Sequence, residues 1–452
     1  MSEGARHREF FALLCLRLSG QRRPETVRRG QAVACRRGRR SDSGRRIRFS
    51  LRLSHYRAER PVARDRMTRE MTLSRRRLFG RAALAASGMI ASPALLARTG
   101  ASRRTSMRGT EAMEEALALL AKTGPEYQGR LANHGPMAAE ALVRLERPEA
   151  VVPWVESYRK RLREHPPGSR SIDPAAWREA LGDDARVGDW IAFFDRRLDD
   201  RPWRAVLGEW TPLLSPGIVA AAFHGVIRTA HAVRSLEEME TPARCRELAE
   251  GLGYWAATYR ALPESLRRAP QRRMPSKAIA QVKAVPAEMR VPGGNITDRL
   301  SPLDSFAPFA GVADLVDSTG DASAFISDLT ETFARVYLVN VARRGSVITY
   351  IHGVTGPSAM RLLLPHLDVK ARSEMLRYGW QAASGLYAAS GGTPGESSAA
   401  AAPRGSREDL IDRALATGDE HAIKFTEACF REYALNPKPV YLKAARDAVE
   451  RL

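Results

Sequence analysis

The spacing of apolar residues beyond about residue 110 constrains the fold more than any other feature of the sequence. Apolar positions recur at intervals of three and four in residues 116–120, 137–145, 151–162, 218–233, 248–259, 322–341 and 372–386. This spacing places apolar side chains on one face of an α-helix. Pro- and Gly-rich breakers separate the segments, and the alternation typical of strands is scarce. We therefore predict an all-α fold, with one large helical domain over residues 105–452.

Two stretches interrupt the helical pattern. Residues 262–311 are polar and lack a clear period. Residues 390–406 read SGGTPGESSAAAAPRGS, which is too small and polar to pack into a core. We expect an irregular region at the first stretch and a flexible linker or surface loop at the second.

The net charge of +21 comes almost entirely from the start of the chain. Residues 1–104 hold 27 Arg and seven acidic residues, whereas the remaining residues hold 45 basic and 44 acidic ones. The near-neutral body gives no electrostatic reason to expect nucleic-acid binding. Residues 1–66 lack lysine and helical periodicity, so we expect a disordered Arg-rich leader. It is either an upstream region that is not translated, with the start at Met67 or Met71, or a basic RNA-binding tail.

Residues 67–104 have the layout of an export signal. Ser74-Arg75-Arg76-Arg77-Leu78-Phe79 precedes a modestly apolar, Ala-rich run over residues 82–96. The Arg-rich stretch resembles a twin-arginine signal with Leu and Phe in swapped order. The alternative is an accidental Arg cluster. We expect export to the periplasm, or a cytoplasmic protein if the signal does not function. The body contains no apolar run of 18 residues, so we expect no membrane anchor.

The common nucleotide and hydrolase motifs are missing from the sequence. It contains no GxGxxG after a strand, no GxxxxGK[ST], no GxSxG and no HExxH. A self-contained flavin or nicotinamide enzyme of the Rossmann type is therefore disfavoured. Cys245 and Cys429 lie 184 positions apart and make no metal-binding pattern.

Histidine placement carries the remaining functional signal. His134 directly precedes a predicted helix, and both His224 and His352 follow apolar runs. A single buried histidine usually packs in a core and bonds a carbonyl. Several in one domain are better compensated for their lost hydration when they share a metal ion. His231 lies seven residues after His224, about 10 Å along a helix, so one ion is not expected to bind both.

His421 and Lys424 are three residues apart, which places them on one helix face. A lysine ammonium has no lone pair and repels a cation. It can join a metal site only as a neutral amine or as the carbamate formed with carbon dioxide. The body contains eight lysines against 37 arginines, so a lysine at this position is less expected by chance than in an average protein. A solvated Lys424 is the alternative.

Five blocks of the body resemble the questin oxidase-like family. They are LANHGPMAAEAL (131–142), PGIVAAAFHGVIRTAHAV (216–233), GLGYWAA (251–257), YIHGVTG (350–356) and HAIK (421–424), in that order over residues 110–450. The family includes enzymes that oxidatively open anthraquinone-type rings, formally by a Baeyer–Villiger-like oxygen insertion. The resemblance implies an all-α fold and a non-haem iron held by histidines and a carboxylated lysine.

Transferred residue by residue, the resemblance implies one set of metal ligands: His134, His224, His352, His421 and Lys424 as its carbamate. His224 is preferred to His231 at its block. Tyr350, His231 and Arg228 are candidates for proton transfer or for orienting a quinone oxygen, with packing or ion pairing as the alternative. Five aromatic residues either line a flat pocket or belong to the core: Trp154, Phe223, Tyr254, Trp255 and Tyr259.

We therefore expect an oxidoreductase, a non-haem Fe(II) oxygenase that uses dioxygen to open a ring of a small phenolic or quinone-type polycyclic substrate. One alternative is an NADPH-dependent Baeyer–Villiger-type monooxygenase of the same family. The other is a secreted helical ligand-binding protein without turnover, whose histidines are structural.

Overall fold

Helices make up nearly all the regular structure of the described residues, which in this computed structural model are 93–265, 272–341, 347–394 and 405–452. The longer helices are α1 (Pro93–Leu120), α2 (Gly135–Arg144), α3 (Pro148–Tyr158), α4 (Val187–Asp200), α5 (Trp203–Leu214), α6 (His224–Glu238), α7 (Pro242–Ala257), α10 (Ala322–Asn340), α11 (Val347–Leu363), α12 (Val369–Ala389), α13 (Arg407–Thr417), α14 (Glu420–Leu435) and α15 (Pro439–Arg451). A two-residue antiparallel hairpin joins β1 (Glu126–Tyr127) to β2 (Leu131–Ala132). The predicted all-α fold is confirmed.

The irregular region expected over residues 262–311 contains only single-turn helices in its described part. They include α8 (Pro275–Ala278), α9 (Ile296–Arg299) and short 3₁₀ turns such as η8 (Ser301–Asp304). The side chain of Asn295 caps α9 by accepting a hydrogen bond from the Asp298 backbone N–H, and the Asp298 carboxylate accepts one from the Asn295 backbone N–H. This cap fixes a loop that borders the cavity described below.

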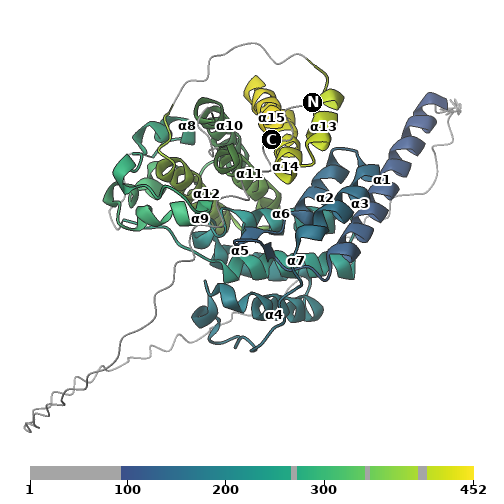
Figure 1. Ribbon diagram of the computed structural model, residues 1–452, viewed down its shortest axis with the longest axis horizontal. Helices are drawn as coiled ribbons and strands as arrows, with labels where there is room; N and C mark the ends of the chain where they lie inside the picture. The colour runs from purple at the N-terminus through teal and green to yellow at the C-terminus, as the bar shows by residue number, and fades with distance from the viewer. Residues whose placement is uncertain (1–92, 266–271, 342–346, 395–404) are drawn as a thin grey trace, which may run out of the picture. The chain divides into compact units, whose positions relative to one another are not determined.

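Four helices from distant parts of the chain pack around one another in the middle of the domain. α2 contacts α6 and α14, and α11 contacts the same two helices, so the contacts close a cycle. We call α2, α6, α11 and α14 the central ring. α1 and α3 cover α2, α7 covers α6, α10 and α12 cover α11, and α15 covers α14 (Figure 1).

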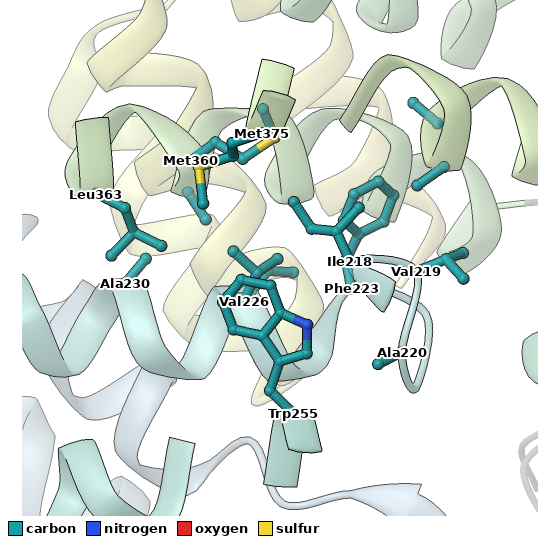
Figure 2. Packing of buried hydrophobic residues seen from close by; sticks show 14 of the residues in the cluster. Ile218, Val219, Ala220, Phe223, Val226, Ala230, Trp255, Met360, Leu363 and Met375 are labelled. Atoms are coloured by element: carbon teal, nitrogen blue, oxygen red, sulfur yellow. The ribbon is translucent and has the colours of Figure 1, made fainter. Parts of the chain in front are cut away.

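Apolar packing holds the ring to its neighbours. Val226 of α6 lies beside Trp255 of α7, while Met360 of α11 lies beside Met375 of α12, and all four side chains are buried (Figure 2). At Gly225 a Cβ atom would come within 2.7 Å of Trp255, so α6 and α7 approach too closely there for any side chain. Burial of this kind contributes roughly 1.5–3 kcal/mol for each large apolar side chain.

The helix predicted over residues 218–233 begins later than expected. α6 begins at His224, and the six residues before it form a turn that follows η5 (Ser215–Gly217). Ala221, Ala222 and Phe223 have positive φ angles of 45°, 57° and 71°. The predicted start was wrong, while residues 224–233 are helical as expected, because this left-handed backbone conformation leaves no trace in the hydrophobic period, and alanine and phenylalanine rarely adopt it.

Three sequence expectations fall largely outside the described residues. The leader over residues 1–66 lies outside them entirely. Of the expected signal over 67–104, residues 93–104 are described and form the first part of α1. Of the expected linker over 390–406, residues 395–404 lie outside the description, and the backbone of Thr393 exchanges hydrogen bonds of 2.9 and 3.0 Å with the Asn340 side chain. Among the described helices, none combines the length and apolar character needed to cross a membrane.

Candidate metal centre

Four buried histidines converge from the four helices of the central ring. His134 directly precedes α2, His224 begins α6, His352 lies within α11, and His421 lies in the first turn of α14. One nitrogen from each of His134, His224 and His421 lies within 4.8 Å of the other two. The Nε2 atom of His352 is 3.1 Å from the Nε2 atom of His224. The structure therefore brings together four side chains that span nearly 290 positions of sequence.

Backbone carbonyls determine which nitrogen of two of these histidines carries hydrogen. His224 Nδ1 donates to the carbonyl of Ala221, and His352 Nδ1 donates to the carbonyl of Ile348 at 2.7 Å. Because a carbonyl oxygen can only accept, hydrogen occupies Nδ1 in both rings and the lone pair of the neutral ring lies on Nε2. Metal-binding histidines are commonly oriented in this way by a bond from their second nitrogen.

The two Nε2 lone pairs of His224 and His352 thus face each other at 3.1 Å. Two acceptors at this distance repel unless a cation lies between them. With metal–nitrogen bonds of about 2.1 Å, adjacent ligands of an octahedral ion are about 3.0 Å apart. The observed separation fits a shared metal ion.

His421 and His134 complete the set of nitrogen donors. His421 Nδ1 lies 3.3 Å from Asp419 Oδ1, the carboxylate that also caps α14 through the His421 backbone N–H. Within the described chain, His134 Nδ1 has no hydrogen-bond partner although the side chain is buried, and the nearest carboxylate oxygen, on Glu420, is 3.8 Å away. An orphaned buried nitrogen is costly unless it binds something, and a metal ion would satisfy it.

The left-handed turn before α6 sets the orientation of His224. Its three positive-φ residues carry side chains, and each such conformation costs on the order of 1–3 kcal/mol. Phe223 is fully buried and packs so closely on α11 that a Cβ atom at Gly356 would lie 2.5 Å from its ring. Tight packing thus holds the turn in place, and the turn aims the Ala221 carbonyl at the His224 ring.

The electrostatic environment keeps the site in a metal-binding protonation state. Burial, followed by the charge of Lys424, lowers the pKa of His134 and of His224 well below the usual value. Burial and the neighbouring imidazoles do the same for the pKa of His352. These three rings are neutral at pH 7, and neutral imidazole is the form that binds metals.

Lys424 follows His421 by one turn of α14 and is only 4% exposed. Its charge lowers the pKa of three of the four histidines, so its amine lies within electrostatic reach of the cluster. Burial lowers the pKa of Lys424 to about 8, against the opposing effect of Glu420 and Asp419. Near pH 8 much of this amine is neutral and nucleophilic, as carbamate formation requires.

A cavity of about 440 Å³ adjoins the histidines. Its rim includes exposed residues such as Leu131 and Gly294, so it reaches the surface beside the β1–β2 hairpin and the loop before α9. The wall is mixed, with aromatic, small apolar and polar side chains: Tyr127, Ala132, Ala221, Ala222, Tyr254, Ile296, Ile348 and Thr349. A cavity of this size and character suits a small organic molecule.

Tyr254 is a buried polar residue of this wall that also lines a neighbouring cavity. Its hydroxyl donates to Glu126 Oε1 at 2.9 Å. Glu126 borders a second, smaller cavity of about 170 Å³ on the other side of Tyr254. Burial raises the pKa of Glu126, an effect that the Tyr254 hydrogen bond partly offsets. Tyr254 therefore lines both cavities, and its hydroxyl bonds a residue that lines the smaller one.

The structure places the three predicted proton-transfer residues outside the lining of the large cavity. Arg228 forms a two-pronged pair with Glu247 at 2.6 and 2.8 Å, and His231 Nδ1 lies 2.7 Å from Glu140 Oε2. Tyr350 is buried, and its phenol adds to the raised pKa of Tyr387. Their role in proton transfer stays a prediction, and these contacts favour ion pairing and packing.

Sequence reasoning missed part of the site. Of the five aromatic residues considered for a flat pocket, the cavity lining includes only Tyr254. Tyr127, Thr349 and Glu420 also line it and had not been singled out. The position of Glu420 beside His421 was a usable signal. The two-residue strand that carries Tyr127 was too short to leave one.

A family model described as questin oxidase-like matches residues 149–429. The chain belongs to the questin oxidase-like family. The matched region contains His224, His352, His421 and Lys424, whereas His134 lies before its first residue. No curated protein matches the chain. For a member of the questin oxidase-like family, the description points to an oxidoreductase that acts on a small molecule of the anthraquinone type.

Proposed function

We propose that the protein is a non-haem Fe(II) oxygenase that opens a ring of a phenolic or quinone-type polycyclic substrate. The observation that carries this proposal is the pair of Nε2 lone pairs on His224 and His352, which face each other at 3.1 Å beside a substrate-sized cavity. Two further buried imidazoles adjoin them, on His134 and His421. Family membership supplies the class of reaction.

The donor set suits a six-coordinate iron. Four neutral imidazoles and one carbamate oxygen from Lys424 leave one octahedral position for an oxygen ligand, and mixed nitrogen and oxygen donors suit Fe(II). The carbamate forms when the neutral Lys424 nitrogen attacks carbon dioxide. A nitrogen–carbon bond forms, one carbon–oxygen π bond becomes an oxygen lone pair, and the nitrogen releases its proton to solvent. Burial favours the neutral amine that this step needs.

The protein's own contribution is positioning and proton transfer. When bound, Fe(II) supplies the electrons with which dioxygen is activated. The cavity wall holds the substrate beside the histidines and limits access of water. In the proposed site the Tyr254 hydroxyl oxygen accepts a hydrogen bond from a phenolic O–H of the substrate, and Glu126, to which the Tyr254 O–H donates, takes up the proton.

Metal analysis and oxygen uptake together test the proposal. The full chain, purified without an affinity tag, is expected to contain close to one iron per chain and to consume oxygen with a hydroxyanthraquinone or its hydroquinone. Uptake without NADPH supports the proposed oxygenase. Uptake that depends strictly on NADPH favours a Baeyer–Villiger-type monooxygenase instead. A native protein that binds no iron and consumes no oxygen would leave the ligand-binding protein as the better account.

A further inference from the structure

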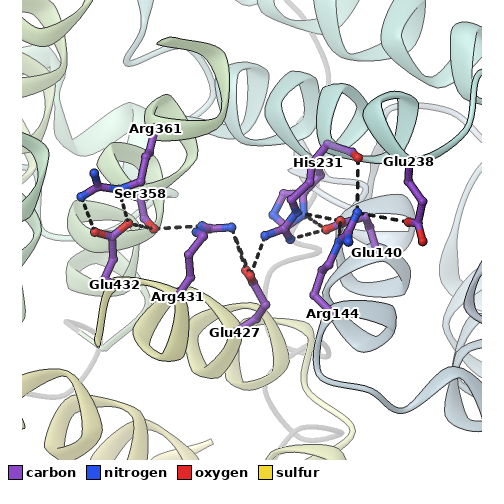
Figure 3. A network of polar contacts seen from close by, with 10 residues as sticks. Glu140, Arg144, His231, Glu238, Ser358, Arg361, Glu427, Arg431 and Glu432 are labelled. Atoms are coloured by element: carbon purple, nitrogen blue, oxygen red, sulfur yellow. Dashed lines mark hydrogen bonds and ion pairs between the residues drawn. The ribbon is translucent and has the colours of Figure 1, made fainter. Parts of the chain in front are cut away.

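A second polar layer crosses the same four helices as the histidines. It consists of buried and partly buried side chains, six charged and one a serine, joined by hydrogen bonds in an unbroken series that we call the ion-pair chain (Figure 3). The residues of the series, in order, are Glu140 of α2, Arg234 of α6, Glu427 and Arg431 of α14, Ser358 of α11, Glu432 of α14 and Arg361 of α11. Every helix of the central ring contributes at least one member.

The contacts of the ion-pair chain are short and specific. Arg234 joins two helices at once, because its Nε donates to Glu140 at 2.7 Å and its Nη1 donates to Glu427 at 2.7 Å. Arg431 continues the series to the Ser358 hydroxyl at 2.9 Å. The three carboxylates are at most 5% exposed. Charges this well buried and paired fix the distance between the groups that carry them.

The ion-pair chain lies about one to three helical turns from the candidate metal ligands. Glu140 follows His134 by six residues, and Ser358 follows His352 by six, which is about 9 Å along a helix. Arg234 follows His224 by ten residues, and Glu427 follows Lys424 by three. His231, which lies between the two layers on α6, contacts Glu140 rather than the histidine cluster. The same four helices thus carry donors for a metal at one level and a network of paired charges at another, in which Arg431 Nε is the one buried atom without a hydrogen-bond partner among the described residues.

We propose that the ion-pair chain positions the four ligand-bearing helices and thereby sets the affinity and geometry of the metal centre. This inference rests on the proposed function for the presence of a metal. Neutral imidazoles do not attract one another, and the facing lone pairs of His224 and His352 repel. In the absence of a cation, the spacing of the ligand layer must be imposed from elsewhere in the ring. The ion-pair chain is a polar connection that reaches all four helices among the described residues.

The variant Glu427→Gln tests the inference, since it removes the charge that Arg234 and Arg431 share. The expected result is a 10- to 100-fold weaker affinity for Co(II), the range seen when groups that support metal ligands are removed. Because the ligands shift, the visible absorption bands of bound Co(II) should move or change intensity. Both are measured by titrating the metal-free full chain against a competing chelator.

Ile191→Ala is the matched control. Ile191 is fully buried in α4, outside the central ring, so this variant loses stability through a cavity. It is expected to bind Co(II) with wild-type affinity and an unchanged spectrum. If Glu427→Gln does not fold, Ser358→Ala is the second test. It removes the hydroxyl that links Arg431 to Glu432 and changes no charge. The affinity for Co(II) is expected to fall about five-fold, which corresponds to roughly one hydrogen bond.

The possible outcomes distinguish failure of this inference from failure of the proposed function. Unchanged affinity and spectrum in Glu427→Gln, or in Ser358→Ala where only that variant folds, would overturn this inference and leave the proposed function standing. An equal loss in Ile191→Ala would overturn it too, because stability alone would then explain the effect. A wild-type chain that binds neither Co(II) nor Fe(II) would overturn the proposed function and this inference together.

Discussion

The histidine layer and the ion-pair chain occupy the same four helices but solve opposite electrostatic problems. In the ion-pair chain each buried charge meets an opposite charge or a hydroxyl within the protein. In the histidine layer, lone pairs face each other, and His134 Nδ1 has no hydrogen-bond partner within the described chain. Within the described chain, Arg431 Nε is the one buried atom of the first layer without a hydrogen-bond partner, and Arg431 is paired through its other nitrogens. In the second layer the unsatisfied nitrogens are ones that a bound cation would satisfy, which is why the proposed function places a metal ion there.

The largest expected effect comes from removing one donor of the histidine layer. His421→Ala should lose bound iron, with an affinity loss of about 1000-fold or more, on the order of 4 kcal/mol. Iron per chain and affinity by chelator competition measure it. His366→Ala is the matched control, because His366 pairs with Glu237 away from the cluster and should keep wild-type iron. Equal iron in both variants would break the distinction between the two kinds of histidine.

Metal removal should destabilise the chain because the lone pairs of the histidine layer then lose their partner. At a free metal concentration of 1000 times the Kd, binding adds about 4 kcal/mol to the free energy of unfolding. Urea unfolding of the metal-loaded and chelator-treated protein measures the difference. In His421→Ala, adding the metal should no longer raise the free energy of unfolding. Full stability without metal in the wild type, unchanged on reloading, would contradict the account.

Much of this arrangement could be predicted from sequence, and the parts that could not have physical reasons. Apolar spacing predicted the helices, and resemblance brought His134, His224, His352, His421 and Lys424 into one set. The ion-pair chain could not be predicted, because its partners are up to 193 positions apart and each residue alone is typical of a solvated helix face. The left-handed turn at Ala221–Phe223 escaped because tertiary packing overrides local preference there.

Acid should weaken the metal-free protein through the histidine layer. The pKa values of three buried rings lie well below 6.5 in the folded chain: those of His134, His224 and His352. Between pH 6.5 and 5.5 these rings therefore bind protons mainly in the unfolded chain. Stability therefore falls as pH drops below 6.5. Between pH 6.5 and 5.5 the three together should lose about 3 kcal/mol of unfolding free energy. Urea unfolding at both pH values measures the fall.

The matched variant sharpens the same experiment. His134→Gln removes one of the three titrating rings, so the fall between pH 6.5 and 5.5 should shrink by about 1 kcal/mol. A fall of wild-type size in His134→Gln would show that other groups cause the acid sensitivity.

The smallest expected effect concerns the cavity wall rather than either layer. Tyr254→Phe removes the hydroxyl that donates to Glu126 and that, in the proposed function, meets the substrate. We expect kcat to fall about 10-fold, equivalent to about 1.4 kcal/mol, with iron content unchanged. Tyr387→Phe serves as the control, because Tyr387 is buried outside the cavity lining and should keep wild-type kcat. Loss of iron in Tyr254→Phe would instead give Tyr254 a structural role.

A crystal of the iron-loaded chain, with anomalous data collected on both sides of the iron absorption edge, tests the central claim most directly. The account predicts one strong iron peak about 2.1 Å from the Nε2 atoms of His224 and His352, with His134, His421 and a carboxylated Lys424 completing its coordination. A peak elsewhere, or no peak at this position in protein loaded with iron, would contradict it.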